Sequence, residues 1–177
     1  DCGMLGSKYL LRALSDHGYA DVAYQVVTRS RSPGWAKMVA SGNTTLWENF
    51  QCGGSDNHVF LGDLSAWFIN YLAGIRHDPN HPGFQRFCIR PEFVPDLDWV
   101  RAHHDSPYGR IVSAWRRVQG RLFMAFSIPP NSSAAVRIPA GAVARPPEGS
   151  GPPAGVAGMK LLRLDDDHAL VELGPGR

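Results

Sequence analysis

The densest group of chemically active side chains lies in one short stretch bounded by glycines. Residues 42–50 have the sequence GNTTLWENF, and residues 55–58, after two further glycines, have the sequence SDNH. A carboxylate, an indole, carboxamides, hydroxyls and an imidazole are therefore close together in the chain. Helix-forming sequence precedes and follows this stretch, which predicts a loop held between two rigid elements. Functional side chains concentrate in loops of this kind.

Glu48 is the side chain of this stretch best suited to catalysis. It stands next to Trp47 and close to Phe50, with amide and hydroxyl groups on either side. A carboxylate in such mixed surroundings can serve as a general base or a general acid. It can equally cap or bridge the end of a helix, and the residues alone leave both interpretations open.

Trp47 and Trp35 are candidate platforms for a ligand. An indole offers a large flat apolar face and a single N–H donor, which suits a sugar ring or a nucleobase. Ordinary packing in the core is the alternative for each of them, and the residues alone do not decide between the two.

Asn57 and His58 are predicted to lie in the first turn of the following helix. Ser55 or Asp56 would then be its N-cap, because short polar side chains favour that position. An imidazole there can hydrogen-bond a ligand hydroxyl, and it can equally bond a local partner.

Neither histidine cluster of the chain favours a metal site. Residues 103–105 are HHD, but adjacent residues of a strand point to opposite faces, so His103 and His104 cannot ligate one ion. Residues 165–168 are DDDH, which predicts a solvated turn. The cysteines at positions 2, 52 and 88 form no CxxC pair. No metal and no cofactor are therefore expected.

Composition narrows the class of protein. The chain has 177 residues, of which 44% are hydrophobic and 19% charged, as in globular domains. A net charge of +2 is too small to suggest a nucleic acid or a membrane as partner. No apolar run approaches the ~20 residues of a membrane span, and no signal peptide pattern is present. The start at Asp1, inside helix-forming sequence, suggests a piece of a longer protein.

The first part of the chain has the apolar spacing of helices. Residues 4–16 and 19–29 are predicted to form a helical hairpin, since only two or three residues join them. A short helical turn is expected at 35–40, and a further helix at 59–72, after the Glu48 loop.

Beyond residue 80 the apolar period changes to two, which is typical of strands. Strands are expected at 84–89, 97–104, 110–118, 122–128, 134–138, 161–164 and 169–173, with a proline- and glycine-rich loop at 146–153. Short strands at this spacing predict an antiparallel β-sandwich. The fold class is therefore α+β, with a helical segment at 1–80 and a sandwich at 81–177.

Several motifs, in order, resemble the C-terminal part of bacterial α-L-rhamnosidases, the inverting enzymes of glycoside hydrolase family 78. The resemblance runs from about residue 3 to about residue 140. Its motifs are YLLRALSD (9–16), the turn at 35–38, TTLWE (44–48), NH (57–58), AGIR (73–76), FCIRP (87–91) and DSPYG (105–109).

The resemblance implies the last helices of an (α/α)6 barrel followed by the family's C-terminal β-sandwich. It implies that Glu48 is the general base that activates water, and that His58, Asn57, Trp47 and Trp35 shape the sugar pocket. Inversion needs a second carboxyl group roughly 6.5–9.5 Å away, which the family places upstream of residue 1. Asn43, the pair Asn49–Phe50, and Asp56 depart from the family pattern, which bears on substrate preference.

The leading hypothesis is therefore the C-terminal piece of an inverting glycosidase that releases terminal α-L-rhamnose from glycosides. It would need the upstream part of the catalytic domain and would be inactive alone, and its uncovered apolar helix faces favour self-association. One alternative is a non-catalytic module for packing or carbohydrate binding, and another is an (α/α)6 hydrolase for a different sugar. The compartment, cytoplasmic or secreted, stays open.

Overall fold

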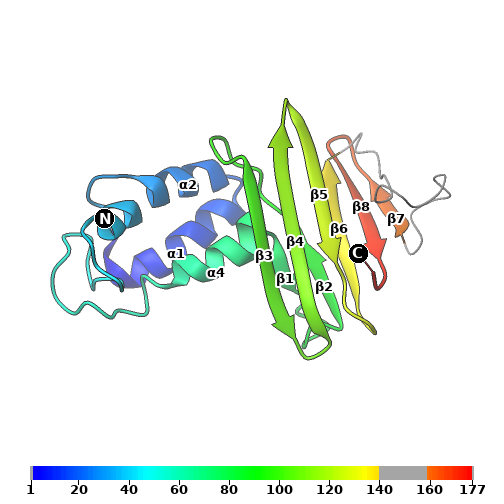
Figure 1. The fold of residues 1–177 in the computed structure, drawn as a ribbon, viewed down its shortest axis with the longest axis horizontal. Helices are drawn as coiled ribbons and strands as arrows, with labels where there is room; N and C mark the ends of the chain where they lie inside the picture. The colour runs from blue at the N-terminus through cyan, green and yellow to red at the C-terminus, as the bar shows by residue number, and fades with distance from the viewer. Residues whose placement is uncertain (1, 140–158, 177) are drawn as a thin grey trace. The chain divides into compact units, whose positions relative to one another are not determined.

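The computed structural model describes residues 2–139 and 159–176, so the proline- and glycine-rich loop expected at 146–153 lies outside the described residues. The chain forms two compact units (Figure 1). The first comprises Asp1–Leu72 and Glu92–Leu97, and the second Ala73–Pro91 and Asp98–Arg177. Helices followed by sheets confirm the predicted α+β class. No helix in the described part of the chain is long and apolar enough to cross a membrane.

The first unit begins with a helical hairpin, as predicted. Helix α1 spans Gly3–Asp16, α2 spans Ala20–Thr28, and the short α3 spans Trp35–Ala40. Gly18, with φ +84°, makes the turn between α1 and α2 in a conformation that glycine adopts without strain. Successive turns of α1 bury Ser7, Leu11 and Ser15, so one stripe of the helix faces the core.

The next helix begins later than the prediction for residues 59–72. Helix α4 spans Asp63–Trp67 and continues as a π-helical turn, η1, over Phe68–Leu72. Residues 59–62 form a turn instead, in which the Gly62 N–H donates to the Val59 carbonyl at 3.0 Å. Gly62 is therefore the N-cap, and the prediction that Ser55 or Asp56 caps this helix is wrong.

Hydrogen bonds and an ion pair connect α4 to α1. The Trp67 indole N–H donates to Ser15 Oγ at 2.8 Å, and that hydroxyl donates to the Leu11 carbonyl at 2.8 Å. Arg12 makes a two-point ion pair with Asp63, with N···O distances of 2.6 and 2.9 Å. This hydrogen bond raises the pKa of Arg12. Because Trp67 is fully buried, its N–H depends on Ser15.

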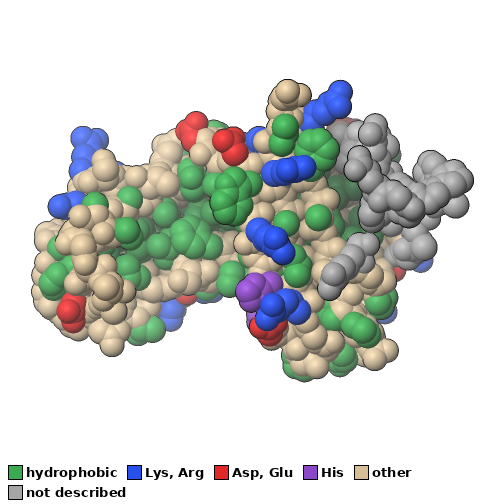
Figure 2. Space-filling view, in the orientation of Figure 1, with side chains coloured by type: hydrophobic (Ala, Val, Ile, Leu, Met, Phe, Trp, Pro, Cys, Tyr) green, Lys and Arg blue, Asp and Glu red, His purple; other side chains and the backbone are tan. Residues whose placement is uncertain are grey.

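The second unit contains two sheets in two layers (Figure 1). One has five strands in the order β1-β2-β6-β8-β7, with bounds Ile75–His77, Arg86–Ile89, Ser133–Pro139, His168–Leu173 and Met159–Leu164. The other is antiparallel and has the order β3-β4-β5, with bounds Trp99–Ser106, Gly109–Val118 and Arg121–Ser127. On the viewed face of the unit, hydrophobic and basic side chains lie side by side over these three strands (Figure 2).

The five-stranded sheet is mixed, so the expectation of a purely antiparallel sandwich is wrong in one place. Strand β2 pairs with β6 in parallel, whereas the other pairs of this sheet are antiparallel. The chain leaves this sheet after β2, builds β3–β5 of the other sheet, and returns as β6. A crossover of this length permits parallel pairing, which a short hairpin does not.

The core of the second unit lies between its sheets. Alternate residues of β4, namely Ile111, Ser113 and Trp115, are buried, which confirms the predicted alternation. The Ser113 hydroxyl donates to the Ala73 carbonyl at 2.7 Å, at the start of the five-stranded sheet. The neighbouring Gly74 has φ +78°, and an added Cβ would lie 2.2 Å from the Arg90 carbonyl carbon. Only glycine fits at this position.

We expect Ser15→Ala to lower the free energy of unfolding by about 1–3 kcal/mol, because it leaves the buried Trp67 N–H without an acceptor. Urea titration followed by circular dichroism measures the change. Thr28→Ala is the matched control: Thr28 also donates to the carbonyl four residues earlier, at 2.9 Å, but is exposed. We expect this control to change stability by less than about 0.5 kcal/mol. Equal losses in both variants would contradict the role given to Ser15.

Candidate active site

The predicted loop around Glu48 is confirmed, since residues 41–62 between α3 and α4 contain no helix or strand. Its two arms pair with each other. The Glu48 N–H donates to the Ser55 carbonyl at 2.7 Å, and the His58 N–H donates to the Leu46 carbonyl at 3.0 Å. The Thr45 hydroxyl donates to the Asp56 carbonyl. This pairing brings Glu48 close to residues well beyond it in the chain.

Asn49 and Phe50 form the turn between the arms and anchor it. Asn49 Oδ1 accepts the N–H groups of Gln51 at 3.0 Å and Gly53 at 3.3 Å, as in an Asx turn. The Phe50 ring is buried and meets the Trp35 indole edge to face, with centroids 4.8 Å apart. The loop is thus fixed to the helical core directly after Glu48.

Trp35 lies in the core beneath the loop. It is only 2% exposed, and its indole N–H donates to the Leu61 carbonyl at 2.9 Å. The structure therefore gives it a supporting position, through Phe50, with no open ring face toward solvent. Of the two tryptophans considered from the sequence, Trp47 is the one that belongs to the loop itself.

The Glu48 carboxylate is held on one side only. Its Oε2 accepts the Ser55 N–H at 3.2 Å, while Oε1 has no hydrogen-bond partner among the described residues. Gly54, with φ +79°, lies against it: an added Cβ would be 2.7 Å from Oε2. A carboxylate with one oriented and one open oxygen is suited to accept a proton from a water molecule.

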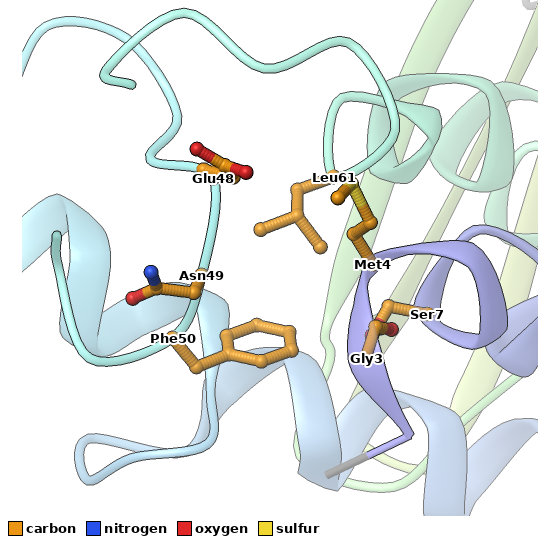
Figure 3. Close-up of a pocket in the computed structure, with 7 residues that line it drawn as sticks. All are labelled: Gly3, Met4, Ser7, Glu48, Asn49, Phe50 and Leu61. Carbon is orange, nitrogen blue, oxygen red and sulfur yellow. The ribbon is translucent and has the colours of Figure 1, made fainter. Parts of the chain in front are cut away.

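A small pocket of about 30 Å³ adjoins the carboxylate (Figure 3). Met4, Phe50 and Leu61 converge on it, Glu48 lies at its rim, and the Asn49 amide points away. Gly3, Ser7 and Asn49 complete its lining. A cavity of this size holds about one or two water molecules. It is too small for a sugar ring.

The loop carries three buried polar atoms with no hydrogen-bond partner among the described residues: Asn43 Nδ2, Trp47 Nε1 and His58 Nδ1. Buried polar groups are nearly always paired, so three in one loop distinguish this surface from the rest of the unit. These amide, indole and imidazole nitrogens are thus not satisfied within the described residues.

Asn57 and His58 are not in the first turn of a helix, contrary to the prediction, because α4 begins only at Asp63. They lie in the returning arm of the loop. The Asn57 side chain is exposed, and its N–H donates to Ser55 Oγ at 3.4 Å. The His58 ring packs against the Phe60 ring at a tilt, with centroids 5.4 Å apart. Lys8 Nζ lies 5.4 Å from the centroid of the Phe60 ring. The loop, and not a helix dipole, therefore positions the imidazole.

Sequence reasoning missed Ser55 and Gly54 as parts of the site. Ser55 acts through its backbone N–H, which has no signature in the sequence. The glycine pair at 53–54 was visible, but its closeness to a carboxylate seven residues earlier depends on the pairing of the arms.

A metal site finds no support in the described part of the chain, which contains no group of three or more potential ligands. His103 and His104 are adjacent on β3, where exposure alternates, and His104 stacks on Phe84 with centroids 4.3 Å apart. In the turn before β8, Asp165 makes an exposed ion pair with Arg163 at 2.6 Å.

Two family models match this chain in succession. Residues 1–72 match the bacterial α-L-rhamnosidase 6 hairpin glycosidase domain, and residues 74–151 match the bacterial α-L-rhamnosidase C-terminal domain. The chain belongs to the bacterial α-L-rhamnosidase family. This confirms the resemblance drawn from the motifs, and the change from one domain to the next coincides with the division between the two compact units.

Relatives of this chain are much longer proteins. An α-L-rhamnosidase of Streptomyces avermitilis is 31% identical over 185 residues, which cover 98% of this chain and 17% of the relative. One from Formosa agariphila is 32% identical over 139 residues, covering 75% of this chain and 15% of the relative. The chain thus spans a small fraction of their length.

Solved rhamnosidases share the fold. The Streptomyces avermitilis α-L-rhamnosidase complexed with L-rhamnose has a TM-score of 0.81 and 29% identity, and the match covers 98% of this chain and 17% of that one. The α-L-rhamnosidase from Dictyoglumus thermophilum has a TM-score of 0.78 and 25% identity, with coverage of 98% and 20%.

Gly54→Ala should displace the Glu48 carboxylate, because the added Cβ takes the space of Oε2 and the backbone there has φ +79°. We expect the Ser55 amide to exchange with deuterium about tenfold faster or more, since its hydrogen bond to Oε2 is lost. Hydrogen–deuterium exchange measured by NMR tests this.

Gly42→Ala is the matched control for this change. Gly42 lies in the same loop with φ +82°, but an added Cβ would meet nothing within 4 Å. It carries the backbone strain without the contact. If Ser55 exchanged equally fast in both variants, the contact between Gly54 and Glu48 would not explain the effect.

Proposed function

We propose that this chain supplies the general base of an inverting glycoside hydrolase that releases terminal α-L-rhamnose from glycosides. The observation that carries the proposal is the half-satisfied carboxylate of Glu48, with Oε2 held by the Ser55 N–H and Oε1 without a partner among the described residues. It adjoins a pocket large enough for water. The names of the relatives, all α-L-rhamnosidases, support the choice of sugar.

In the proposed reaction a water molecule lies between Glu48 and the anomeric carbon. As the water oxygen bonds to that carbon, its proton passes to Glu48 and the glycosidic C–O bond breaks. A second carboxyl group gives its proton to the leaving oxygen from the opposite face, roughly 6.5–9.5 Å from the first. In this proposal the upstream part of the catalytic domain supplies that acid, and residues 1–80 contribute closing helices of an (α/α)6 barrel beside it.

The remaining loop residues bind the sugar in this proposal. Trp47 Nε1 and His58 Nδ1 are buried atoms without partners in the described structure, and each can pair with a sugar hydroxyl. The exposed Asn57 carboxamide offers a further donor and acceptor. Trp35 contributes indirectly, because it holds Phe50 and thereby the turn that follows Glu48.

Glu48→Gln tests the base in the full-length protein that contains this chain. We expect the hydrolysis of an aryl α-L-rhamnoside to slow about 10²–10⁴-fold, the usual contribution of a general base, with substrate binding largely kept. Proton NMR of the wild-type reaction should show the β-anomer of rhamnose first, as inversion requires.

Asp166→Asn is the matched control, since it makes the same change from carboxylate to amide at an exposed position outside the loop. We expect its turnover to stay within about twofold of the wild type, because surface changes away from the reacting atoms have small effects. Wild-type turnover in Glu48→Gln, or the α-anomer appearing first, would exclude Glu48 as the base of an inverting enzyme.

The alternative proposal is a non-catalytic helical and sandwich module, and the small size of the pocket beside Glu48 is the observation in its favour. We expect the 177-residue chain assayed alone to release no rhamnose from an aryl rhamnoside, because Glu48 has no opposing acid there. Adding the upstream part of the protein as a separate polypeptide should restore turnover. Turnover by the chain alone would contradict the need for an upstream acid, and a full-length protein without turnover would favour the non-catalytic module.

A further inference from the structure

The outer face of the three-stranded sheet carries an aromatic and cationic surface that the proposed reaction does not use. Directly opposed residues on neighbouring strands lie on the same face of a sheet. The register places Trp99 of β3 opposite Arg116 of β4, and Arg116 opposite Phe123 of β5. These three residues form one row across the sheet, on the face opposite the buried Ile111 and Trp115.

Both rings of this row are open to solvent. Trp99 is 67% exposed and Phe123 is 47% exposed, although aromatic side chains of this size are usually largely buried. The Arg116 guanidinium lies over the Phe123 ring, 5.4 Å from its centroid. Such stacking holds the cation in place while leaving its N–H groups free to bind an anion.

The adjacent row across the three strands contains two small side chains. Arg101 of β3 lies opposite Ala114, which in turn lies opposite Ala125 of β5. The small alanine side chains leave open space beside the arginines. Neither Arg101 nor Arg116 has an ion-pair partner among the described residues. Figure 2 shows basic and hydrophobic side chains interspersed on this face.

The charge changes at the far end of the face. Arg110 and Asp105 form their own two-point pair at 2.7 and 3.2 Å, and this hydrogen bond lowers the pKa of Asp105. The positive charge available to a ligand is therefore that of Arg101 and Arg116, beside the two rings, together with the exposed Arg121, which shares this face with Phe123.

We propose that this face, defined by Trp99, Arg101, Arg116 and Phe123, binds an oligosaccharide that carries carboxylate groups. Sugar rings stack on exposed aromatic faces, and an arginine binds a carboxylate through two parallel hydrogen bonds. Neighbouring strands are about 4.8 Å apart, so the backbones of β3 and β5, which carry the two rings, are about 10 Å apart, a span comparable with two linked sugar rings.

The choice of a glycan rests on the proposed function, because a glycosidase meets its terminal sugar as part of a larger glycan. A nucleic acid fits less well, since the chain has a net charge of only +2 and the described part of this face has three arginines without an ion pair, Arg101, Arg116 and Arg121. The test measures binding without turnover, so that failure of this site and failure of the proposed reaction are distinguishable.

Isothermal titration of the 177-residue chain with tetragalacturonate, and with its fully methyl-esterified form, tests the proposal. We expect the acid to bind at least about tenfold more tightly than the ester, because esterification removes the charges that the arginines recognise. Trp99→Ala and Arg116→Gln should each weaken binding of the acid about tenfold or more, as loss of a stacking platform or an ionic partner does.

Two controls are matched to these variants. Tyr19→Ala removes another exposed ring, 56% exposed, from the first unit. Arg163→Gln removes an exposed arginine that is paired with Asp165. Both should bind the acid within about twofold of the wild type, as surface changes outside the site do.

Four results would overturn the proposal. Equal binding of acid and ester, or equal losses in the control variants, would remove the basis for a carboxylate site. Tighter binding of an oligothymidylate of the same charge would assign the face to a nucleic acid. Dimerisation that Trp99→Ala abolishes, seen by analytical ultracentrifugation, would assign it to a second copy of the chain.

Discussion

The reciprocal hydrogen bonds between Glu48 and Ser55 are the constraint on which the proposed site depends. The backbone of each residue donates to the other: the Glu48 N–H to the Ser55 carbonyl, and the Ser55 N–H to the Glu48 carboxylate. A carboxylate on a loop would otherwise sample many rotamers. Here the hydrogen bonds that close the loop also orient the Glu48 carboxylate, so the orientation of the carboxylate depends on the fold of the loop.

That loop is only as rigid as the helices beneath it. Phe50 connects it to Trp35, and Trp35 connects to Leu61, where the chain returns toward α4. Helix α4 is in turn bonded to α1 through Trp67 and Ser15. Buried aromatic residues, two of them with paired indole N–H groups, therefore link the loop that carries Glu48 to the helices.

The sequence predicts the elements better than their ends and partners. Apolar spacing predicts α1 and α2, and the glycines around Glu48 predict the loop, because both signals are local. Val59, Phe60 and Leu61 resemble the start of a helix, yet residues 59–62 form a turn and α4 begins only at Asp63, so the predicted place of His58 was wrong. A period of two indicates a strand without its direction, which is why the parallel pair of β2 and β6 was not foreseen. The role of the Ser55 backbone N–H has no local signal at all.

Buried polar groups are paired between α1 and α4, whereas several in the loop around Glu48 are not. Between α1 and α4 the Trp67 indole, the Ser15 hydroxyl and Asp63 are all paired. In the loop, Asn43, Trp47 and His58 each keep a buried nitrogen without a partner among the described residues. Each such atom costs about 1–3 kcal/mol unless something satisfies it. This contrast, in the same loop as a carboxylate with an unpaired oxygen, is the physical basis for the proposal that the loop binds a polar ligand.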